Sequence, residues 1–173
     1  TANDCTQDCN GAFGGPDNTK DTGDEAYEDH CDTCDADPAN DCVLLTLSSN
    51  SAGSAVVSYV SSYDISGFQM NVSGPTILSA SSDIGDVSFN ANTGELLGYG
   101  PEGQDLSATC IIDNYGDLCP LDSPAELLSV GFSESHLGYS LELQNVVLLD
   151  NQDSPQDLVI SGLSAVSVQA CDD

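Results

Sequence analysis

Residues 68–72 decide the fold, because Phe68-Gln69-Met70-Asn71-Val72 places apolar and polar side chains in strict alternation. Alternation with a period of two is typical of a β-strand that has one buried face and one solvated face. Leu141 and Leu143 repeat the pattern farther along the chain. The sequence therefore predicts sheets whose apolar faces form a shared core.

Short apolar and β-branched runs follow one another from Val43 onward, separated by Gly, Asn, Asp, Ser and Pro. No segment has a sustained helical period, although Glu126–Val130 also fits a short helix or turn. The continuously apolar run Val146–Leu149 indicates a strand that is packed on both sides or lies at a sheet crossover. Many short strands with turns between them favour a sandwich or a barrel. The predicted strands are Val43–Leu47, Ala55–Tyr63, Phe68–Val72, Thr76–Ser79, Val87–Asn90, Glu95–Tyr99, Ser107–Ile112, Ala125–Phe132, Ser140–Leu149 and Leu158–Val168.

The chain is strongly acidic: it has 29 acidic side chains and one basic side chain, Lys20, for a formal charge of -28. Such a chain becomes compact when salt screens the repulsion, since the Debye length falls to about 3 Å at molar salt, or when bound cations neutralise it. Binding to nucleic acid and to anionic membrane surfaces relies on Lys and Arg, so both classes of partner are excluded. No apolar stretch is long enough to cross a bilayer, and we predict no membrane insertion.

The composition changes abruptly at Cys42. Residues 1–42 contain 12 of the 29 acidic residues, five of the eight cysteines, and no Val, Ile or Leu. Such a segment cannot offset its ordering entropy by burying apolar area, so it needs covalent or metal cross-links. We predict two regions: an acidic, disulfide-rich and loop-dominated appendage at residues 1–42, and a β-sandwich domain at residues 43–173.

Oxygen-bearing side chains form two clusters in the appendage, and we predict that the appendage binds at least one Ca2+. Calcium takes six to eight oxygen ligands from closely spaced Asp, Asn and carbonyl groups on flexible loops. The alternative is a solvated acidic loop held by disulfides alone, but like charges this close oppose compaction, which favours calcium. No strict EF-hand spacing is present. The predicted ligands are Asp17, Asn18, Asp21 and Asp24 in one cluster, and Asp29, Asp35, Asp37, Asn40 and Asp41 in the other.

The eight cysteines form a high and even set, which is typical of disulfides in an extracellular protein. A bond between Cys110 and Cys119 would close a short loop; five cysteines then remain in the appendage and one near the end, so one bond must join the two regions. Zinc is less favoured, because only one pair has the CxxC spacing. We expect a secreted or cell-surface protein, either processed or one module of a longer chain. The predicted disulfide cysteines are Cys5, Cys9, Cys31, Cys34, Cys42, Cys110, Cys119 and Cys171.

Two stretches of the appendage, Asp8–Gly15 and Glu28–Cys42, are similar to the Cys/Asp-rich repeats of large secreted proteins from aquatic microbes, in the style of thrombospondin type 3 calcium repeats. The sequence departs from the usual pattern at Asp32, where Gly is usual, and by extra residues around 16–25. The rest of the chain resembles a cohesin-like jelly-roll β-sandwich of the carbohydrate-binding-module-like superfamily. Modules of these kinds bind protein partners, link domains or build extracellular scaffolds, and the resemblance implies no catalysis. The stretches that carry the second resemblance are Tyr63–Met70, Asn92–Tyr99, Leu143–Asp150 and Ala165–Val168.

No catalytic constellation stands out, because the chain has no GxSxG motif and its two histidines and 29 acidic residues select no pair. We expect a non-enzymatic structural module of an extracellular microbial scaffold, filament or adhesin, with copies of itself or neighbouring modules as partners. The alternative is a protein- or carbohydrate-recognition module, which a flat exposed face carrying Tyr59, Tyr63 or Tyr99 would favour.

Asn71-Val72-Ser73 is the single N-glycosylation sequon of the sequence. The alternation places Asn71 on the face opposite Phe68, Met70 and Val72. Asn71 is therefore either a glycosylation site on a solvated face or an ordinary polar strand residue.

Overall fold

The computed structural model describes residues 7–13, 26–28, 33–36, 42–51, 53–101, 104–109, 124–133, 139–150, 160–161 and 165–168. Within these ranges every element of regular secondary structure is a strand, which confirms the all-β prediction. The ambiguous segment Glu126–Val130 belongs to a strand and not to a helix. Over the same ranges we find no helix with the length and apolar character that crossing a membrane requires.

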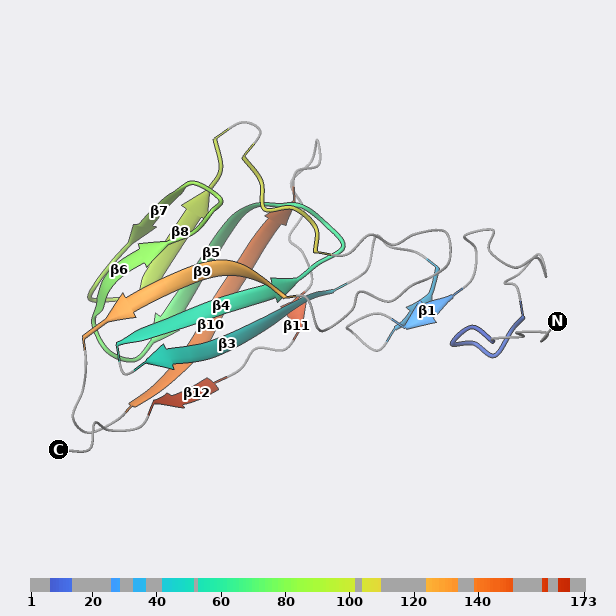
Figure 1. Ribbon diagram of the computed structural model, residues 1–173, viewed down its shortest axis with the longest axis horizontal. Coiled ribbons are helices and arrows are strands. Elements are labelled where there is room, and N and C mark those ends of the chain that lie inside the picture. The colour runs from blue at the N-terminus through green and yellow to red at the C-terminus, as the bar shows by residue number, and fades with distance from the viewer. Residues whose placement is uncertain are drawn as a thin grey trace.

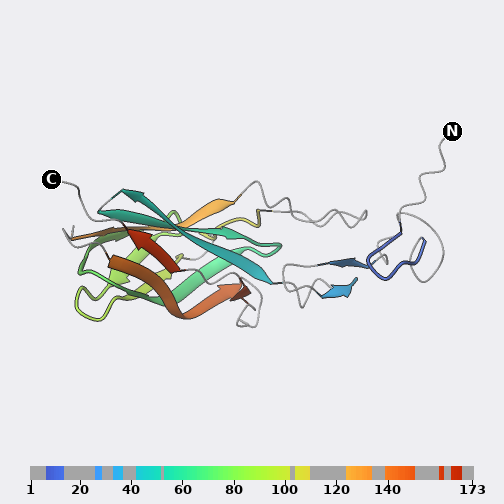
Figure 2. The same cartoon turned by 90° about the horizontal axis from the view of Figure 1, so that it is seen from below.

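Ten strands form two five-stranded sheets, which pack face to face as a β-sandwich (Figures 1 and 2). All neighbouring strands are antiparallel except β11 and β3, which run parallel. We call one sheet the front sheet and the other the back sheet, irrespective of the view in Figure 1. The front sheet contains, in spatial order, β12 (Ala165–Val168), β10 (Tyr139–Asp150), β5 (Ile65–Ser73), β8 (Glu95–Tyr99) and β7 (Asp86–Phe89). The back sheet contains β11 (Ile160–Ser161), β3 (Val43–Ser51), β4 (Ser54–Val60), β9 (Ala125–Phe132) and β6 (Ile77–Ser81).

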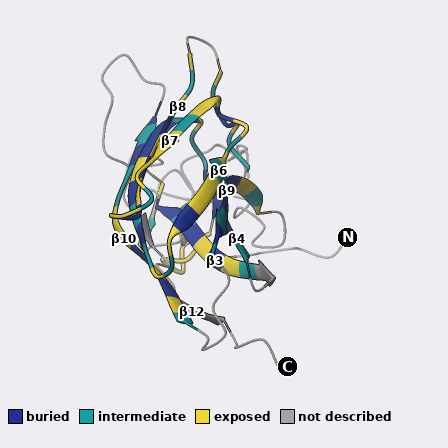
Figure 3. Ribbon diagram, turned by 90° about the vertical axis from the view of Figure 1, so that its left-hand side faces the viewer, coloured by how far each residue is buried: buried dark blue, intermediate teal, exposed yellow. Residues whose placement is uncertain are grey.

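The hydrophobic core lies between the two sheets and contains buried side chains from β3, β4, β5, β6, β8, β9 and β10. Figure 3 colours the residues by their burial. Phe68, Met70 and Val72 on β5 are at most 5% exposed, as their alternation predicts. Leu45 and Val57 meet them from the back sheet and are fully buried. Burial of one such side chain contributes about 1.5–3 kcal/mol, so the alternating strands supply the stability that the appendage sequence cannot.

The register of β10 against β5 contains a β-bulge. Pairing moves from Gln144 opposite Asn71 to Val147 opposite Gln69, so three steps on β10 match two on β5. Asn145 lies in the bulge with φ 50°, a left-handed conformation that Asn adopts more readily than other residues with a side chain. The extra residue shifts all that follows it by one position.

This shift determines which residues of the apolar run Val146–Leu149 face the core. Leu143 is buried before the bulge and Leu148 is buried after it, so the buried positions change from odd to even numbers. The other three residues of the run are half-buried. Val146 packs against the core, whereas Val147 and Leu149 face outward. The run lies within one strand of one sheet, so the prediction of a crossover is wrong, and the outward side chains are only half-buried.

The predicted strand Ser107–Ile112 is wrong for its described residues, 107–109, which form no ladder. Side chains hold this segment instead: the Tyr59 hydroxyl donates to the Ser107 carbonyl at 2.8 Å, and the Ala108 amide donates to Asp64 Oδ1 at 2.8 Å. The Thr109 amide donates to the Ser61 carbonyl at 2.9 Å. Two side chains and one backbone carbonyl thus satisfy backbone groups that a strand would have satisfied by pairing.

The predicted strand Leu158–Val168 is wrong as a single element. Ile160–Ser161 runs parallel to β3 in the back sheet, whereas Ala165–Val168 runs antiparallel to β10 in the front sheet. The chain changes sheets between these two strands, which continuous apolar character cannot reveal.

A separate two-stranded antiparallel sheet lies beyond the sandwich on the N-terminal side (Figures 1 and 2). It consists of β1 (Tyr27–Glu28) and β2 (Cys34–Asp35). The loop at residues 7–13 joins this sheet through the Cys9 amide, which donates to the Ala26 carbonyl at 3.4 Å. The sandwich begins at β3, immediately after the buried Cys42.

Candidate functional site

The outward side chains of the front sheet lie in cross-strand rows that follow from the pairing register; we call this surface the front face. Residues directly opposite each other on neighbouring strands project from the same side of a sheet. One row contains Leu149, Gly67, Tyr99 and Asp86, and the next contains Val147, Gln69, Leu97 and Ser88.

Four apolar side chains of these rows form a patch, which we call the apolar patch: Leu97, Tyr99, Val147 and Leu149. Leu97 is 47% exposed and Tyr99 is 52% exposed, while Val147 and Leu149 are half-buried. A Cβ placed on Gly67 would meet Leu149 Cδ1 at 3.5 Å, so the leucine lies beside the glycine on this face. Gln69 and Gly67 of β5 lie between the two pairs, so the apolar side chains gather on one face across three neighbouring strands. Exposed apolar side chains gathered in this way indicate an interaction site.

Other large apolar side chains that are exposed within the described ranges lie apart from the front face. Leu78 is 63% exposed on β6 of the back sheet, and Phe13 is 50% exposed in the N-terminal loop. Phe89 is 39% exposed, but it pairs with Leu96, whose side chain points into the core. Exposure on these elements is scattered, whereas Leu97 and Tyr99 share one face of one strand.

Polar groups border the apolar patch on the side of the bulge. Asn71 Nδ2 donates to the Thr93 carbonyl at 3.5 Å, and Asn145 Nδ2 donates to Asn71 Oδ1 at 3.4 Å. Gln69 Nε2 donates to Glu95 Oε1 at 3.4 Å. These contacts are long and exposed, so the amides retain hydrogen-bonding capacity for a partner.

The structure separates the three tyrosines that the sequence offered as outward residues. Tyr99 is exposed, Tyr63 is half-buried, and Tyr59 is a core residue with 2% exposure, so only Tyr99 meets the condition that favours a recognition face. Burial raises the pKa of the Tyr59 hydroxyl above its ordinary value, and the charge of Asp64 raises it further. The hydroxyl is engaged in an internal hydrogen bond to Ser107 and cannot contact a ligand.

The sequence did not single out Leu97, Val147 or Leu149. Two adjacent leucines at 96 and 97 obscure the alternation of β8, and the bulge obscures that of β10. A usable signal was present, because Leu97 and Tyr99 lie two residues apart in a predicted strand and must share a face.

The predicted calcium ligands lie almost entirely outside the described residues. Asp35 is on β2, and its side chain is not described. Over the part of the chain that the structure describes, no three His, Cys, Asp or Glu side chains are grouped to hold a metal ion. Calcium binding stays a prediction. The predicted ligands outside the described ranges are Asp17, Asn18, Asp21, Asp24, Asp29, Asp37, Asn40 and Asp41.

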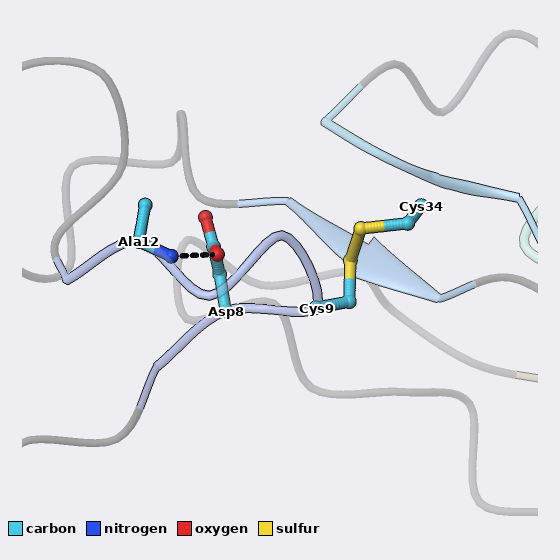
Figure 4. Close-up of a disulfide and its surroundings, with 4 residues drawn as sticks. All are labelled: Asp8, Cys9, Ala12 and Cys34. Carbon is cyan, nitrogen blue, oxygen red and sulfur yellow. Dashed lines mark hydrogen bonds between the residues drawn. A yellow bond between two sulfur atoms is a disulfide. The ribbon is translucent and has the colours of Figure 1, made fainter.

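One predicted disulfide is complete within the described residues. Cys9 and Cys34 are bonded, with their Cα atoms 5.9 Å apart, and attach the loop at residues 7–13 to β2 (Figure 4). In that loop the Ala12 amide donates to Asp8 Oδ1 at 2.7 Å. Cys42 is also disulfide-bonded. Cys5, Cys31, Cys110, Cys119 and Cys171 lie outside the described residues.

The sequon residue Asn71 lies on the front face as the alternation predicts, and its side chain is half-buried. Ser73 Oγ donates to the Glu142 carbonyl at 3.4 Å, so the sequon is part of the β5–β10 ladder. Its glycosylation stays a prediction.

No protein-family model matches the sequence, and no curated protein matches it. Among solved structures, a chain in the crystal structure of a CaDoc0917 variant in complex with CaCohA2, at pH 5.5, matches with a TM-score of 0.50. The match covers 75% of this chain and 99% of that chain, at 13% sequence identity. A likeness at this identity concerns the fold alone, and with the two-sheet architecture it identifies the fold as a cohesin-like β-sandwich.

Proposed function

We propose that this chain is a protein-recognition module and that it binds its partner through the front face. The observation that carries this proposal is the apolar patch, in which Leu97 and Tyr99 are about half exposed side by side. Protein interfaces combine an apolar centre with a polar rim, and the amides and carboxylates around the patch supply such a rim. The fold likeness to a chain solved in a protein complex supports the same function.

The test compares the double variant Leu97→Ser/Tyr99→Ser with the matched control Leu78→Ser. Leu78 is more exposed than either residue of the patch but lies on the back sheet. The full chain and both variants are immobilised and exposed to cell-surface and secreted proteins of the source organism, and bound proteins are identified by mass spectrometry. Affinity of each purified candidate is then measured by biolayer interferometry.

We expect a genuine partner to lose about 30-fold or more in affinity for the double variant, because central aromatic residues carry about 2 kcal/mol or more. The Leu78→Ser variant binds that partner as the parent does. Partners that bind the double variant and the parent equally would contradict the proposal. Far-UV circular dichroism confirms that all variants keep the sheet.

A carbohydrate is the second candidate ligand, because exposed Tyr99 offers a ring for stacking against a sugar. Retention of the chain on a glycan column that Tyr99→Ala abolishes, with no protein partner dependent on Leu97, would favour this function. In both cases the proposed chemistry is binding and not catalysis.

The module is further proposed to act outside the cell, as a unit of a scaffold, filament or adhesin. The Cys9–Cys34 disulfide supports an oxidising location. Electron microscopy and light scattering of the native material, with calcium and then with EGTA, test the assembly. Ordered polymers that loosen on chelation are expected; a monomer that is indifferent to EGTA would remove this part of the proposal.

Calcium is proposed to hold the appendage together, because the paired acidic clusters lie in a segment without Val, Ile or Leu. Calorimetric titration of the calcium-free chain is compared with titration of Asp37→Asn/Asp41→Asn. The control is Asp83→Asn, an exposed carboxylate in the sandwich. Heat that the double substitution abolishes and the control retains is expected; equal heats in all three chains would refute a site at residues 37 and 41.

A further inference from the structure

Carboxylates border the apolar patch on more than one side. Asp86 is exposed and lies directly opposite Tyr99 in the β7–β8 pairing. Glu95 is exposed two residues before Leu97 on the same strand, and it accepts a hydrogen bond from Gln69 at the centre of the face. The hydrogen bond holds this carboxylate over the front face.

Within the part of the chain that the structure describes, no Lys or Arg lies beside these carboxylates. The sequence contains one lysine and no arginine, and that lysine, Lys20, belongs to the appendage. Glu142, also exposed, accepts a hydrogen bond from Gln144 Nε2 at 3.1 Å, which adds a third carboxylate beyond the bulge. The apolar patch therefore has a rim of one sign.

We infer that the front face takes a protein partner whose docking surface has an apolar centre and a rim of Lys or Arg. This inference rests on the proposed function and specifies the chemistry of the partner. An acidic partner would bring like charges together around the patch, which opposes docking, whereas basic side chains pair with Asp86, Glu95 and Glu142. The formal charge of -28 adds long-range attraction for a cationic surface and accelerates its approach.

A second copy of this chain does not fit the same face. Two copies that dock front to front bring two sets of exposed carboxylates, Asp86 and Glu95 of each copy, into one interface without added basic groups. Each copy also carries a formal charge of -28. This repulsion persists at physiological salt where carboxylates of the two copies come within the Debye length of about 8 Å.

The test selects binders to the full chain from a yeast-displayed library of a small helical scaffold whose surface is randomised without charge bias. Clones that lose binding to Leu97→Ser/Tyr99→Ser are retained, which limits the set to ligands of the apolar patch. Their affinities are then measured for Glu95→Gln and for Glu126→Gln. Glu126 is an exposed carboxylate on β9 of the back sheet. Each variant therefore removes one negative charge, and the two differ only in the sheet from which the charge is removed.

We expect the retained clones to be enriched in Lys and Arg around apolar positions. Their affinity falls about three-fold with Glu95→Gln, the size of one exposed ion pair, and falls further as salt is raised. Glu126→Gln changes affinity by less than about 1.5-fold, because it alters only the distant field.

Clones that depend on the patch but carry neutral or acidic rims would overturn the inference and leave the proposed function in place. Equal effects of Glu95→Gln and Glu126→Gln would also overturn it. An absence of any clone that depends on Leu97 and Tyr99 would contradict the proposed function itself. A dimer of the chain in sedimentation equilibrium that Leu97→Ser dissociates would make a second copy the occupant and refute the basic partner.

Discussion

Gly98 packs against the Phe68 ring in the core, and its two neighbours on β8 are side chains of the apolar patch. It lies on β8 between Leu97 and Tyr99, and an added Cβ would overlap the Cε1 and Cζ atoms of the Phe68 ring. Phe68 is 1% exposed, so the ring has no solvent to move into. We predict that Gly98→Ala destabilises the sandwich by forcing the ring out of its position.

The magnitude follows from two opposing terms. Insertion of a methyl group into a packed core costs about 1–3 kcal/mol. Replacement of glycine by alanine lowers the entropy of the unfolded chain and returns about 0.4–1 kcal/mol. The net expectation for Gly98→Ala is a loss of about 1–2 kcal/mol in the free energy of unfolding.

A double-mutant cycle with Phe68→Leu isolates the overlap. Phe68→Leu alone costs about 1 kcal/mol through lost burial, and it removes the ring atoms that the new methyl group would strike. In that background Gly98→Ala should be neutral or stabilising, whereas in the parent chain it should be destabilising. The coupling energy should exceed about 1 kcal/mol.

The assay is equilibrium urea unfolding followed by far-UV circular dichroism, with the disulfides kept oxidised and the salt concentration constant. Additive effects of the two substitutions, or a Gly98→Ala chain as stable as the parent, would refute the reasoning. A loss of the same size in both backgrounds would mean that strand geometry, and not the Phe68 ring, excludes a side chain at Gly98.

Three further predictions concern separate parts of the chain. The fold raises the pKa of Tyr59 above 10.0, so the contribution of its protonated hydroxyl to the free energy of unfolding is fully present below about pH 10 and is lost as the pH rises through the raised pKa. Tyr59→Phe should cost about 1 kcal/mol at neutral pH and should lose less stability than the parent above pH 10. Alkaline unfolding curves that are the same for the parent and the variant would contradict this. Asn145→Gly should be within about 0.5 kcal/mol of the parent, whereas Asn145→Val should lose about 1–2 kcal/mol at φ 50°; equal urea midpoints would show that the bulge is not under this constraint. Cys9→Ser/Cys34→Ser should accelerate amide exchange in residues 7–13 while the thermal midpoint of the sandwich stays the same, and a large fall in that midpoint would show that the appendage and the sandwich unfold together.

Local pattern was sufficient to predict most of the sandwich. The predicted bounds of Glu95–Tyr99 and Ala125–Phe132 agree with β8 and β9. Phe68, Met70 and Val72 alternate with polar residues, and one sheet face buries all three. In each case the strand lies between turn residues and has one buried face, so neighbours in the sequence carry the information.

Sequence pattern failed where partners distant in the chain decide the structure. Ser107 is held by the hydroxyl of Tyr59, 48 positions earlier, and not by a neighbouring strand. The sequence alone does not say whether Tyr59 faces outward, as a recognition face would require, or inward. Its burial depends on which face of β4 meets the front sheet, and that choice follows from the whole register.

The apolar patch illustrates the same limit at the candidate site. Leu97 and Tyr99 are two residues apart, so their common face could be predicted from the sequence. Their proximity to Val147 and Leu149 depends on β5, which lies between β8 and β10 in the front sheet. The acidic rim was implicit in the composition, but its place beside the patch depends on Asp86 pairing with Tyr99.

The bulge at Asn145 connects the fold to the proposed function. Before the bulge the odd-numbered residues of β10 point inward, as the burial of Leu143 shows. Without the extra residue, Val147 and Leu149 would continue that series into the core. The bulge turns both of them outward beside Gln69 and Gly67, in the rows that contain Leu97 and Tyr99. A single residue in the left-handed region thus doubles the number of apolar side chains in the patch. The position of the proposed docking surface therefore depends on backbone geometry more than on composition.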